Sequence, residues 1–424
     1  MAFPFRRKRQ ALQGRYTPNL WPVWIVAPLA LIAASALGWV IYHYAYDHFT
    51  QAAADQTPPK PVNTNDVLKA TVTALTLIGA VLAGLYAYRK QLLAEGDAHR
   101  ADASQLADRY TTAAEQLGHE QAAVRLAGVY ALARLADDWA EQRQVCIDVL
   151  CAYLRMPYEP DPTTSEHKAG EREVRQTIIR VIRDHLQTPD AATAWCRQSF
   201  NFTGAIFDGG DFSTSHFQNK VSFGGATFSS GMISFNDSTF SSGEVYFNDA
   251  TFNGGTVDFG NATFNGGTVY FNDATFNGGK VYFNDATFSS GTVDLTGATF
   301  RGGTVDLSYA TFNGGTVDLI DATFNGGKVY FNYATFSSGE VYFNDATFSS
   351  GEVYFNLATF NGGTVDFSLA TFNGGEVYFN DATFSSGTVD FGNATFSSGT
   401  VLFNGATFTG TVFEWGALPV PAGA

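Results

Sequence analysis

The chain has 424 residues, of which 15% are charged and 15% aromatic, and a formal net charge of −15 at pH 7. That charge belongs to residues 200–424, where 20 carboxylates stand against four basic side chains, a net charge of −16. An acidic surface of this kind excludes direct nucleic-acid binding and favours basic partners. The three cysteines suit a reducing compartment and indicate no disulfide framework.

The amino-terminal fifth predicts a membrane anchor. Residues 1–20 are basic, and residues 21–42 carry no charge and are long enough to span a bilayer, with Trp and Tyr near both ends. A second apolar stretch, residues 67–90, follows a proline-containing linker, residues 43–66. We therefore expect two transmembrane helices.

The distribution of basic residues predicts the orientation of this anchor. Basic side chains flank the outer ends of both spans, at residues 1–20 and at Arg89 and Lys90, and are scarce between them. The positive-inside rule then places both termini in the cytoplasm and the linker outside a bacterial inner membrane. A cleaved signal peptide is the alternative, but it leaves Arg89 and Lys90 unexplained.

Residues 91–190 form a predicted cytoplasmic helical module, a small HEAT-like bundle. Apolar residues recur at helical spacing, and Gly128 marks a close approach of two helices. Charged residues around the last stripe, Arg175 among them, are predicted to face solvent. The expected apolar stripes are Val124, Gly128, Ala131 and Leu135; Val145, Val149, Ala152 and Tyr153; and Val174, Ile178, Val181, Ile182 and Leu186.

The second half of the chain repeats a twelve-residue phrase. The phenylalanine of A-T-F recurs sixteen times in steps of twelve, from Phe228 to Phe408, and a V-x-F or V-x-L phrase lies between successive copies. Residues two apart on a strand share a face, so Val269 and Phe271 point inward and Tyr270 outward. The expected core ladder includes Phe202, Phe207, Phe212, Phe217, Phe228, Phe252, Phe264, Phe276, Phe288, Phe312, Phe336, Phe360, Phe384 and Phe408.

Strands this short require stacking as coils of a solenoid. Phe202, Phe207, Phe212 and Phe217 are spaced by five, and each twelve-residue unit divides into two pentads and two extra residues. Two units therefore predict a four-sided coil of about 24 residues, and residues 200–415 hold about nine coils. The alternative is a flat coil of twelve residues, in which two residues would have to cross a gap of about 10 Å between facing sheets.

Residues 200–415 resemble the pentapeptide-repeat family, which implies a right-handed quadrilateral β-helix. That family has a bulky residue at the centre of each pentad and a small residue two places earlier. Here the phenylalanine and leucine series takes the central place, and the small place holds Ala205, Gly210, Ser215, Ala226 and the later alanines. The departures are the regular two-residue insertion and a valine in place of alanine in every other pentad.

The phrase DRYTTAAEQLGHEQAAVRLAGVYALARL, residues 108–135, resembles a stretch that precedes the repeats in many actinobacterial pentapeptide-repeat membrane proteins. The later EREVRQTIIRVIRDHL is similar to the next helix of the same proteins. This resemblance implies a membrane-anchored member of the family and no particular activity.

Two sets of outward residues are candidates for a binding surface. In a coil of the expected size, three tyrosines stack in one column and two aspartates stack in the opposite one. A stacked exposed ladder without a ligand is the alternative interpretation. The residues are Tyr330, Tyr354, Tyr378, Asp294 and Asp318.

No residues are assigned to catalysis, to a cofactor or to a metal. The histidines and cysteines lack metal-site spacing, and Cys146 and Cys151 are predicted core residues of a helix. Phosphate-binding, dinucleotide-binding and nucleophile-elbow motifs do not occur. The repeated aspartates have identical exposed environments, whereas paired acid–base carboxylates need contrasting ones.

The sequence thus predicts an α+β multidomain protein with two transmembrane helices, a helical module, a solenoid and a tail, residues 416–424. The expected function is a non-enzymatic scaffold whose acidic rod binds a protein, with self-association through the solenoid end near Trp415 as a further expectation. One alternative is a DNA-mimicking regulator of an enzyme such as a topoisomerase. Another is an extracellular surface- or ice-binding solenoid, which needs the opposite membrane topology.

Overall fold

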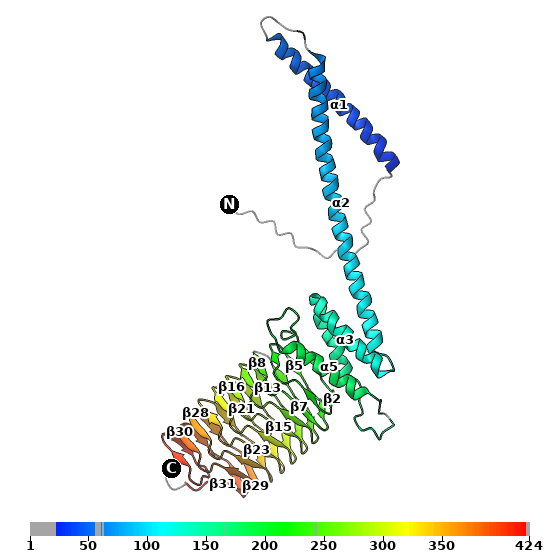
Figure 1. Ribbon diagram of the computed structural model, residues 1–424. Coiled ribbons are helices and arrows are strands. Elements are labelled where there is room, and N and C mark those ends of the chain that lie inside the picture. Colours follow the sequence, from blue (N-terminus) through cyan, green and yellow to red (C-terminus); the bar gives the residue numbers. More distant parts are fainter. Residues whose placement is uncertain (1–22, 56–60, 62, 166, 242–243, 421–424) are drawn as a thin grey trace. The chain divides into compact units, whose positions relative to one another are not determined.

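The computed structural model of the protein describes residues 23–55, 61, 63–165, 167–241 and 244–420. The chain divides into two compact units, Met1–Asp102 and Ala103–Ala424 (Figure 1). The helices are α1 (Val23–Ala54), α2 (Thr64–Leu117), α3 (Ala122–Asp138), the 3-10 helix η1 (Ala140–Gln142), α4 (Arg143–Leu154) and α5 (Glu171–Leu186).

The first unit consists of α1 and the greater part of α2. Within the described residues, Thr64–Gln91 is the one helical stretch long and apolar enough to cross a membrane. The predicted first span, residues 21–42, begins outside the described residues and continues in α1, and it stays a prediction. Helix α1 runs on to Ala54, so part of the segment assigned to a linker, residues 43–66, is helical.

Helices α3, α4 and α5 form the core of the helical module. The stripe predicted on α5 is buried throughout, and its members pack in one cluster with residues of α3 and α4. The stripe predicted on α4 is rotated, because Val145 is 42% exposed. Cys146, Ile147 and Leu150 are buried instead, because this face of α4 is the one that packs against the neighbouring helices.

Gly128 allows a close contact between α3 and the end of α2, as its sequence context predicted. A Cβ atom at this position would lie 2.5 Å from the backbone nitrogen of Leu117. Only glycine therefore lets the two helices approach at this crossing. On the same helix, Val124 and Ala131 are half-buried, while Leu135 is buried.

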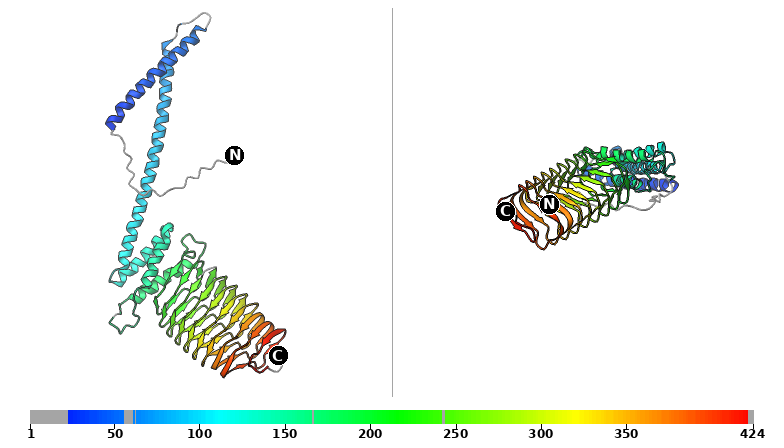
Figure 2. Two further views of the ribbon diagram at one scale, coloured as in Figure 1. Left: turned by 180° about the vertical axis from the view of Figure 1, so that it is seen from behind. Right: turned by 90° about the horizontal axis from the view of Figure 1, so that it is seen from below.

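The solenoid consists of short strands in two sheets, stacked along one axis in Figures 1 and 2. One sheet holds β1 (Phe200–Asn201), β4 (His216–Phe217), β5 (Val221–Ser222), β8 (Thr239–Ser241), β9 (Val245–Tyr246), β12 (Thr263–Asn265), β13 (Thr268–Tyr270), β16 (Thr287–Ser289), β17 (Thr292–Asp294), β20 (Thr311–Asn313), β21 (Thr316–Asp318), β24 (Thr335–Phe336), β25 (Glu340–Tyr342), β28 (Thr359–Asp366), β30 (Thr383–Asp390), β32 (Thr407–Phe408) and β33 (Thr411–Glu414).

The other sheet holds β2 (Ile206–Phe207), β3 (Gly210–Asp211), β6 (Thr227–Phe228), β7 (Met232–Ser234), β10 (Thr251–Phe252), β11 (Thr256–Asp258), β14 (Thr275–Phe276), β15 (Lys280–Tyr282), β18 (Thr299–Phe300), β19 (Thr304–Asp306), β22 (Thr323–Phe324), β23 (Lys328–Tyr330), β26 (Thr347–Phe348), β27 (Glu352–Tyr354), β29 (Thr371–Tyr378) and β31 (Thr395–Leu402). All of the pairings are parallel, as a solenoid requires.

The strand register settles the size of the coil. Thr251 pairs with Thr275, and Val293 pairs with Val317, so equivalent positions recur after two twelve-residue units. The prediction of about 24 residues per coil is therefore confirmed, and the twelve-residue coil is wrong. The first coil is shorter, because Phe200 pairs with Val221, a step of 21 residues. The pentads between them lack one two-residue insertion and one residue of the other.

Phenylalanines fill the interior in continuous stacks. Successive rings of one column, such as Phe252 and Phe276, lie 4.7 Å apart and nearly parallel. The predicted ladder residues are buried except Phe408, which is half-buried in the last coil. The ladder is therefore several columns, with Phe252 and Phe276 in one sheet and Phe264 and Phe288 in the other.

Helix α5 covers the beginning of the solenoid (Figure 1). Arg172 binds Asp208 at 2.8 Å, and the side-chain amide of Gln176 donates to the carbonyl of Gly209 at 2.8 Å. Ile179 lies directly over Gly210, where a Cβ atom would meet it at 2.8 Å. The helical module thus caps the first coil and shields its strand edges.

Candidate functional site

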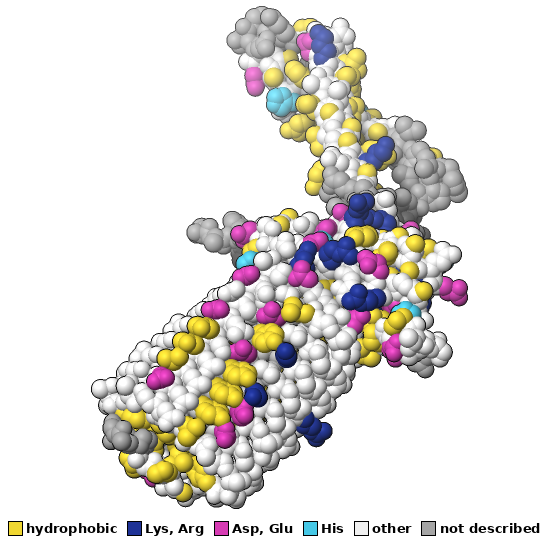
Figure 3. All heavy atoms as spheres, turned by 60° about the horizontal axis from the view of Figure 1, so that its bottom comes forward, with side chains coloured by type: hydrophobic (Ala, Val, Ile, Leu, Met, Phe, Trp, Pro, Cys, Tyr) yellow, Lys and Arg dark blue, Asp and Glu magenta, His cyan; other side chains and the backbone are white. Residues whose placement is uncertain are grey.

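Three tyrosines form a ladder on one outer face of the solenoid. Tyr330, Tyr354 and Tyr378 occupy the middle of successive V-x-F phrases on β23, β27 and β29, directly above one another in register. Their rings stack at 4.8 Å. Stacking follows from the repeat, because equivalent residues of successive coils are separated by the spacing between neighbouring strands, which lies within the range of aromatic contact distances. Figure 3 shows hydrophobic strips with acidic and basic side chains beside them along the solenoid.

Each glutamate of the face engages the tyrosine two residues later. The hydroxyls of Tyr354 and Tyr378 donate to the carboxylates of Glu352 and Glu376. Burial, followed by the bond to Glu352, raises the pKa of Tyr354 to about 12. Lys328 binds Glu352 at 2.5 Å across neighbouring coils, and this contact lowers the pKa of the Glu352 carboxyl. The face is thus an ordered hydrogen-bonded surface at neutral pH.

The two candidate aspartates lie on the opposite sheet. Asp294 and Asp318 pair directly in β17 and β21, whereas the tyrosine ladder belongs to the other sheet. Each accepts a hydrogen bond from the backbone amide two residues on, at Thr296 and Ile320, which closes the corner of the coil. Burial, reinforced by Asp294, raises the pKa of Asp318. These aspartates are corner-forming residues, and they share no site with the tyrosines.

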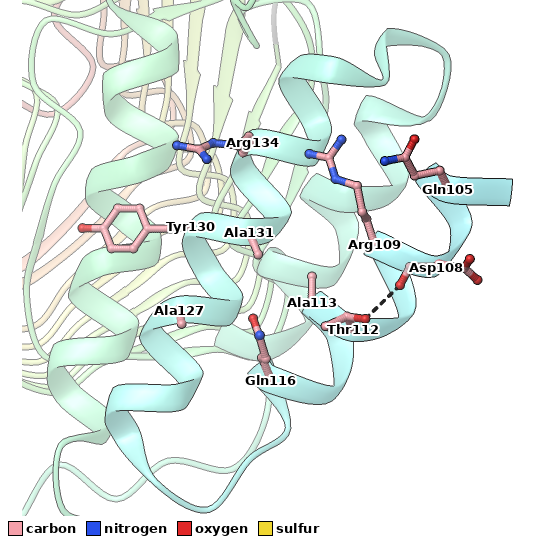
Figure 4. A pocket seen from close by; sticks show the side chains of 10 residues that line it. All are labelled: Gln105, Asp108, Arg109, Thr112, Ala113, Gln116, Ala127, Tyr130, Ala131 and Arg134. Carbon is pink, nitrogen blue, oxygen red and sulfur yellow. Dashed lines mark hydrogen bonds between the residues drawn. The ribbon is translucent and has the colours of Figure 1, made fainter. Parts of the chain in front are cut away.

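The helical module contains a groove between the end of α2 and α3 (Figure 4). It has a volume of about 660 Å³, with Ala113, Ala127 and Ala131 between the helices. Arg109, which binds Asp138 at 2.7 Å, and Arg134 also line it. The small alanine side chains leave room for a segment of another chain. The residues that line the groove do not bring acid–base or nucleophilic side chains together.

A buried polar network joins the module's helices to each other and to the first coil. Arg125, 1% exposed, lies 3.2 Å from the carboxylate of Glu171, which also accepts a hydrogen bond from Tyr153 at 2.8 Å. Arg175 donates to the carbonyls of Leu154 and Ile206. The prediction that Arg175 faces solvent is wrong, because its guanidinium supplies donors to backbone carbonyls at the junction.

The described residues contain no group of three or more His, Cys, Asp or Glu side chains close enough to hold a metal ion. Cys146 and Cys151 are buried core residues, as predicted, and burial raises the pKa of Cys146 to about 11 and that of Cys151 to about 12. Both thiols therefore stay protonated at neutral pH and are poor nucleophiles.

A second exposed apolar column, Tyr309, Tyr333 and Leu357, was not predicted from the sequence. These residues occupy the corner place that holds Asp or Asn in four other coils, and they are 53%, 47% and 43% exposed. The signal was present in the sequence, because F-N-D-A changes to L-S-Y-A, F-N-Y-A and F-N-L-A at these coils.

Comparison with known families supports the architecture. Residues 242–287 and 290–335 match the family model described as pentapeptide repeats, nine copies. This part of the solenoid is a pentapeptide-repeat segment. No curated protein and no solved structure matches the chain. Solenoids of pentapeptide repeats are suited to protein–protein interaction and are typically non-catalytic.

Proposed function

We propose that the protein is a membrane-anchored, non-enzymatic scaffold that presents its acidic solenoid to a protein partner in the bacterial cytoplasm. The observation that carries this proposal is the tyrosine ladder of Tyr330, Tyr354 and Tyr378, an ordered aromatic strip on an otherwise polar, repetitive face. Aromatic side chains with hydrogen-bonding tips are enriched at protein interfaces. The extended, regular shape of stacked coils provides a large contact surface.

The anchor in this proposal consists of two helices. The stretch Thr64–Gln91 has the length and composition of a membrane span, and residues 21–42 provide the second span. Basic residues at the outer ends favour cytoplasmic termini at the inner membrane. The actinobacterial resemblance of residues 108–135 agrees with this arrangement.

Site-specific photo-crosslinking tests the binding face. A benzoylphenylalanine in place of Tyr354 retains an aromatic ring in the ladder, and the matched control replaces Tyr270, an outward tyrosine of the other sheet stacked on Tyr246 at 4.8 Å. In cells that produce the full chain, irradiation is expected to yield a discrete protein adduct from position 354 and none from position 270. Equal adducts from both positions, or none from either, would contradict a specific face.

The DNA-mimicking alternative is favoured by one observation, the net charge of −16 over residues 200–424. Regular acidic columns present charge to basic enzymes in the manner of a duplex. A supercoiling assay with a bacterial topoisomerase and the full chain distinguishes the two roles. Inhibition or protection at stoichiometric amounts supports mimicry, and no effect at saturation supports the scaffold.

A further inference from the structure

One corner of every coil depends on a residue in the left-handed backbone conformation. The residue follows the outward strand of the tyrosine face by three positions, and its φ lies between 55° and 70° in successive coils. Asp and Asn tolerate this conformation, and glycine adopts it freely. The column reads Thr214, Asp237, Asn261, Asp285, Tyr309, Tyr333, Leu357, Asp381 and Gly405.

Three successive coils place an unsuitable residue at this corner. Tyr309, Tyr333 and Leu357 have φ of 62°, 60° and 59°, which costs a residue of their type about 1 kcal/mol. Inter-coil hydrogen bonds of about 2.9–3.0 Å hold the conformation, for example from the amide of Tyr333 to the carbonyl of Asn356. The solenoid itself needs no large side chain here, since five coils of the column have Asp, Asn or Gly.

The same three residues expose apolar surface. Tyr309 and Tyr333 stack at 4.7 Å with an interplanar angle of 3°, and about half of each side chain is open to solvent. A backbone penalty and an exposed apolar surface thus coincide at the same positions. We take this coincidence as the mark of a contact surface, because neither property improves the isolated fold.

The corner column adjoins the tyrosine ladder in the sequence and in the coil. Tyr330 and Tyr354 precede Tyr333 and Leu357 by three residues, so each of these coils contributes an outward aromatic ring and a large corner residue. We name the set Tyr309, Tyr330, Tyr333, Tyr354 and Leu357 the corner strip.

Carboxylates surround the corner strip. Asp285 and Asp381 stand at the next positions of the corner column on either side, and Glu352 and Glu376 lie on the tyrosine face. The strip's own coils contain two basic residues. Lys328 is already held by Glu352, and Arg301 precedes β19, at the other end of that strand from Tyr309. The surface is therefore apolar in the middle and acidic at its borders, which suits a cationic partner.

The chain's own lysines demonstrate the contact that such a partner would make. The ammonium of Lys220 lies 4.0 Å from the ring centre of Tyr246, and that of Lys328 lies 5.7 Å from the ring centre of Tyr354. Both are cation–π distances. Tyr309 and Tyr333 present the same kind of ring without a basic side chain of the described residues over it.

We propose that the corner strip binds a basic, extended segment of a partner protein, whose arginine or lysine side chains stack on Tyr309 and Tyr333 and pair with the bordering carboxylates. Arginine suits this surface better than lysine, because its planar guanidinium stacks on aromatic rings and is less strongly hydrated. This proposal rests on the scaffold function and names the chemistry of its partner.

Peptide binding to the full chain in non-ionic detergent tests the proposal. The probe is a fluorescent twelve-residue peptide that alternates arginine and glycine, measured by anisotropy at about 0.15 M salt. The key variant is Tyr309→Asn/Tyr333→Asn/Leu357→Asn, which copies the residue at Asn261 of the same column and changes no charge. The matched control is Leu369→Asn, a 52% exposed leucine with φ of 63° at a corner of the other sheet.

The triple variant is expected to bind the arginine peptide at least tenfold more weakly, and Leu369→Asn to bind it as the unmodified chain does. Both variants should unfold at the same or a higher denaturant concentration, because asparagine relieves the backbone penalty, so lost binding would not reflect lost folding. A lysine version of the peptide should bind more weakly than the arginine version.

Unchanged binding by the triple variant would overturn the proposal, since attraction to the acidic rod alone would then explain the affinity. Equal binding of a glutamate peptide, or a change in the oligomeric state of the chain in place of peptide binding, would overturn it as well. If the crosslink from position 354 forms while the arginine peptide does not bind, the scaffold function stands and only the basic partner is wrong.

Discussion

The helical module and the solenoid are stabilised in opposite ways. In the module each polar contact is made once, as in the buried contact of Arg125 with Glu171, and no other residue can replace it. In the solenoid a contact made by one residue recurs in every coil, as in the stacked rings of Phe252 and Phe276. In the module, the loss of stability on substitution should therefore be large where a contact has no second copy. In the solenoid, it should depend on how far the substituted residue lies from the end of the stack.

The largest expected loss of stability comes from removal of the buried ion pair between Arg125 and Glu171 in the module. Arg125→Ala leaves the carboxylate of Glu171 buried without its cation, which should destabilise the module by about 3–5 kcal/mol. Hydrogen exchange of the amides of α3 and α5 measures this loss. The control Arg180→Ala, which removes an exposed pair with Glu173, should change exchange by less than about 1 kcal/mol. Equal effects of the two variants would contradict the account.

Removal of one ring from the solenoid should depend on position. Phe276→Ala empties space in the middle of a stack and should cost about 3–5 kcal/mol. Phe408→Ala, in the half-buried last coil, should cost about half as much, because part of that ring is already in water. Urea unfolding of the two variants checks the difference, and a larger loss at Phe408 would contradict it.

Substitution of Gly128 tests the close crossing of α2 and α3 in the helical module. Gly128→Ala should cost about 1–3 kcal/mol, because its Cβ would lie 2.5 Å from the backbone nitrogen of Leu117 and separate α2 from α3. Gly118→Ala is the control, since its Cβ would meet its nearest atoms at 3.6 Å and 3.7 Å. Thermal unfolding followed by circular dichroism distinguishes the two, and a comparable loss in both would show that the crossing is not close.

The smallest expected effects concern the pH dependence of stability, which should differ between Glu352 on the tyrosine face and Asp318 in the aspartate column. Glu352 has a pKa lowered by Lys328, so its stabilisation is present above about pH 4.3 and is lost as the pH falls. Asp318 has a pKa raised by burial, so its ionisation costs stability as the pH rises above about 3.9.

At pH 7, Glu352→Gln should destabilise the solenoid and Asp318→Asn should stabilise it, each by less than about 1 kcal/mol. Both differences should shrink as the pH falls toward 3, because the carboxyls take up protons over this range. Urea unfolding at pH 7 and pH 3 measures them, and two variants that shift stability in the same direction would contradict the assigned environments.

The solenoid was predictable because its pattern is repeated. The spacing of Phe202, Phe207, Phe212 and Phe217 and the two-residue insertions led to a coil of two twelve-residue units, which the pairing of Thr251 with Thr275 confirms. In a repeat, the same assignment of inward and outward residues must hold in every coil, so an ambiguous position in one unit is resolved by the equivalent positions in the others.

The module and the corner strip were less predictable. Apolar residues lie on more than one face of the twelve-residue helix α4, so hydrophobicity alone does not choose between Val145 and Cys146 for the buried face, and tertiary packing decides. The burial of Arg175 depends on carbonyls at Leu154 and Ile206, which are distant in the sequence. The strain at Tyr309 and Tyr333 becomes evident only once the φ of that corner is known.

Membrane topology is the measurement that tests the scaffold account most directly. A compartment-sensitive reporter is fused after Ala424 and, in a separate chain, inserted within residues 50–60. The account predicts a cytoplasmic reporter at the carboxyl end and an external one in the linker. A carboxyl end outside the cell would contradict it and would favour the surface- or ice-binding role.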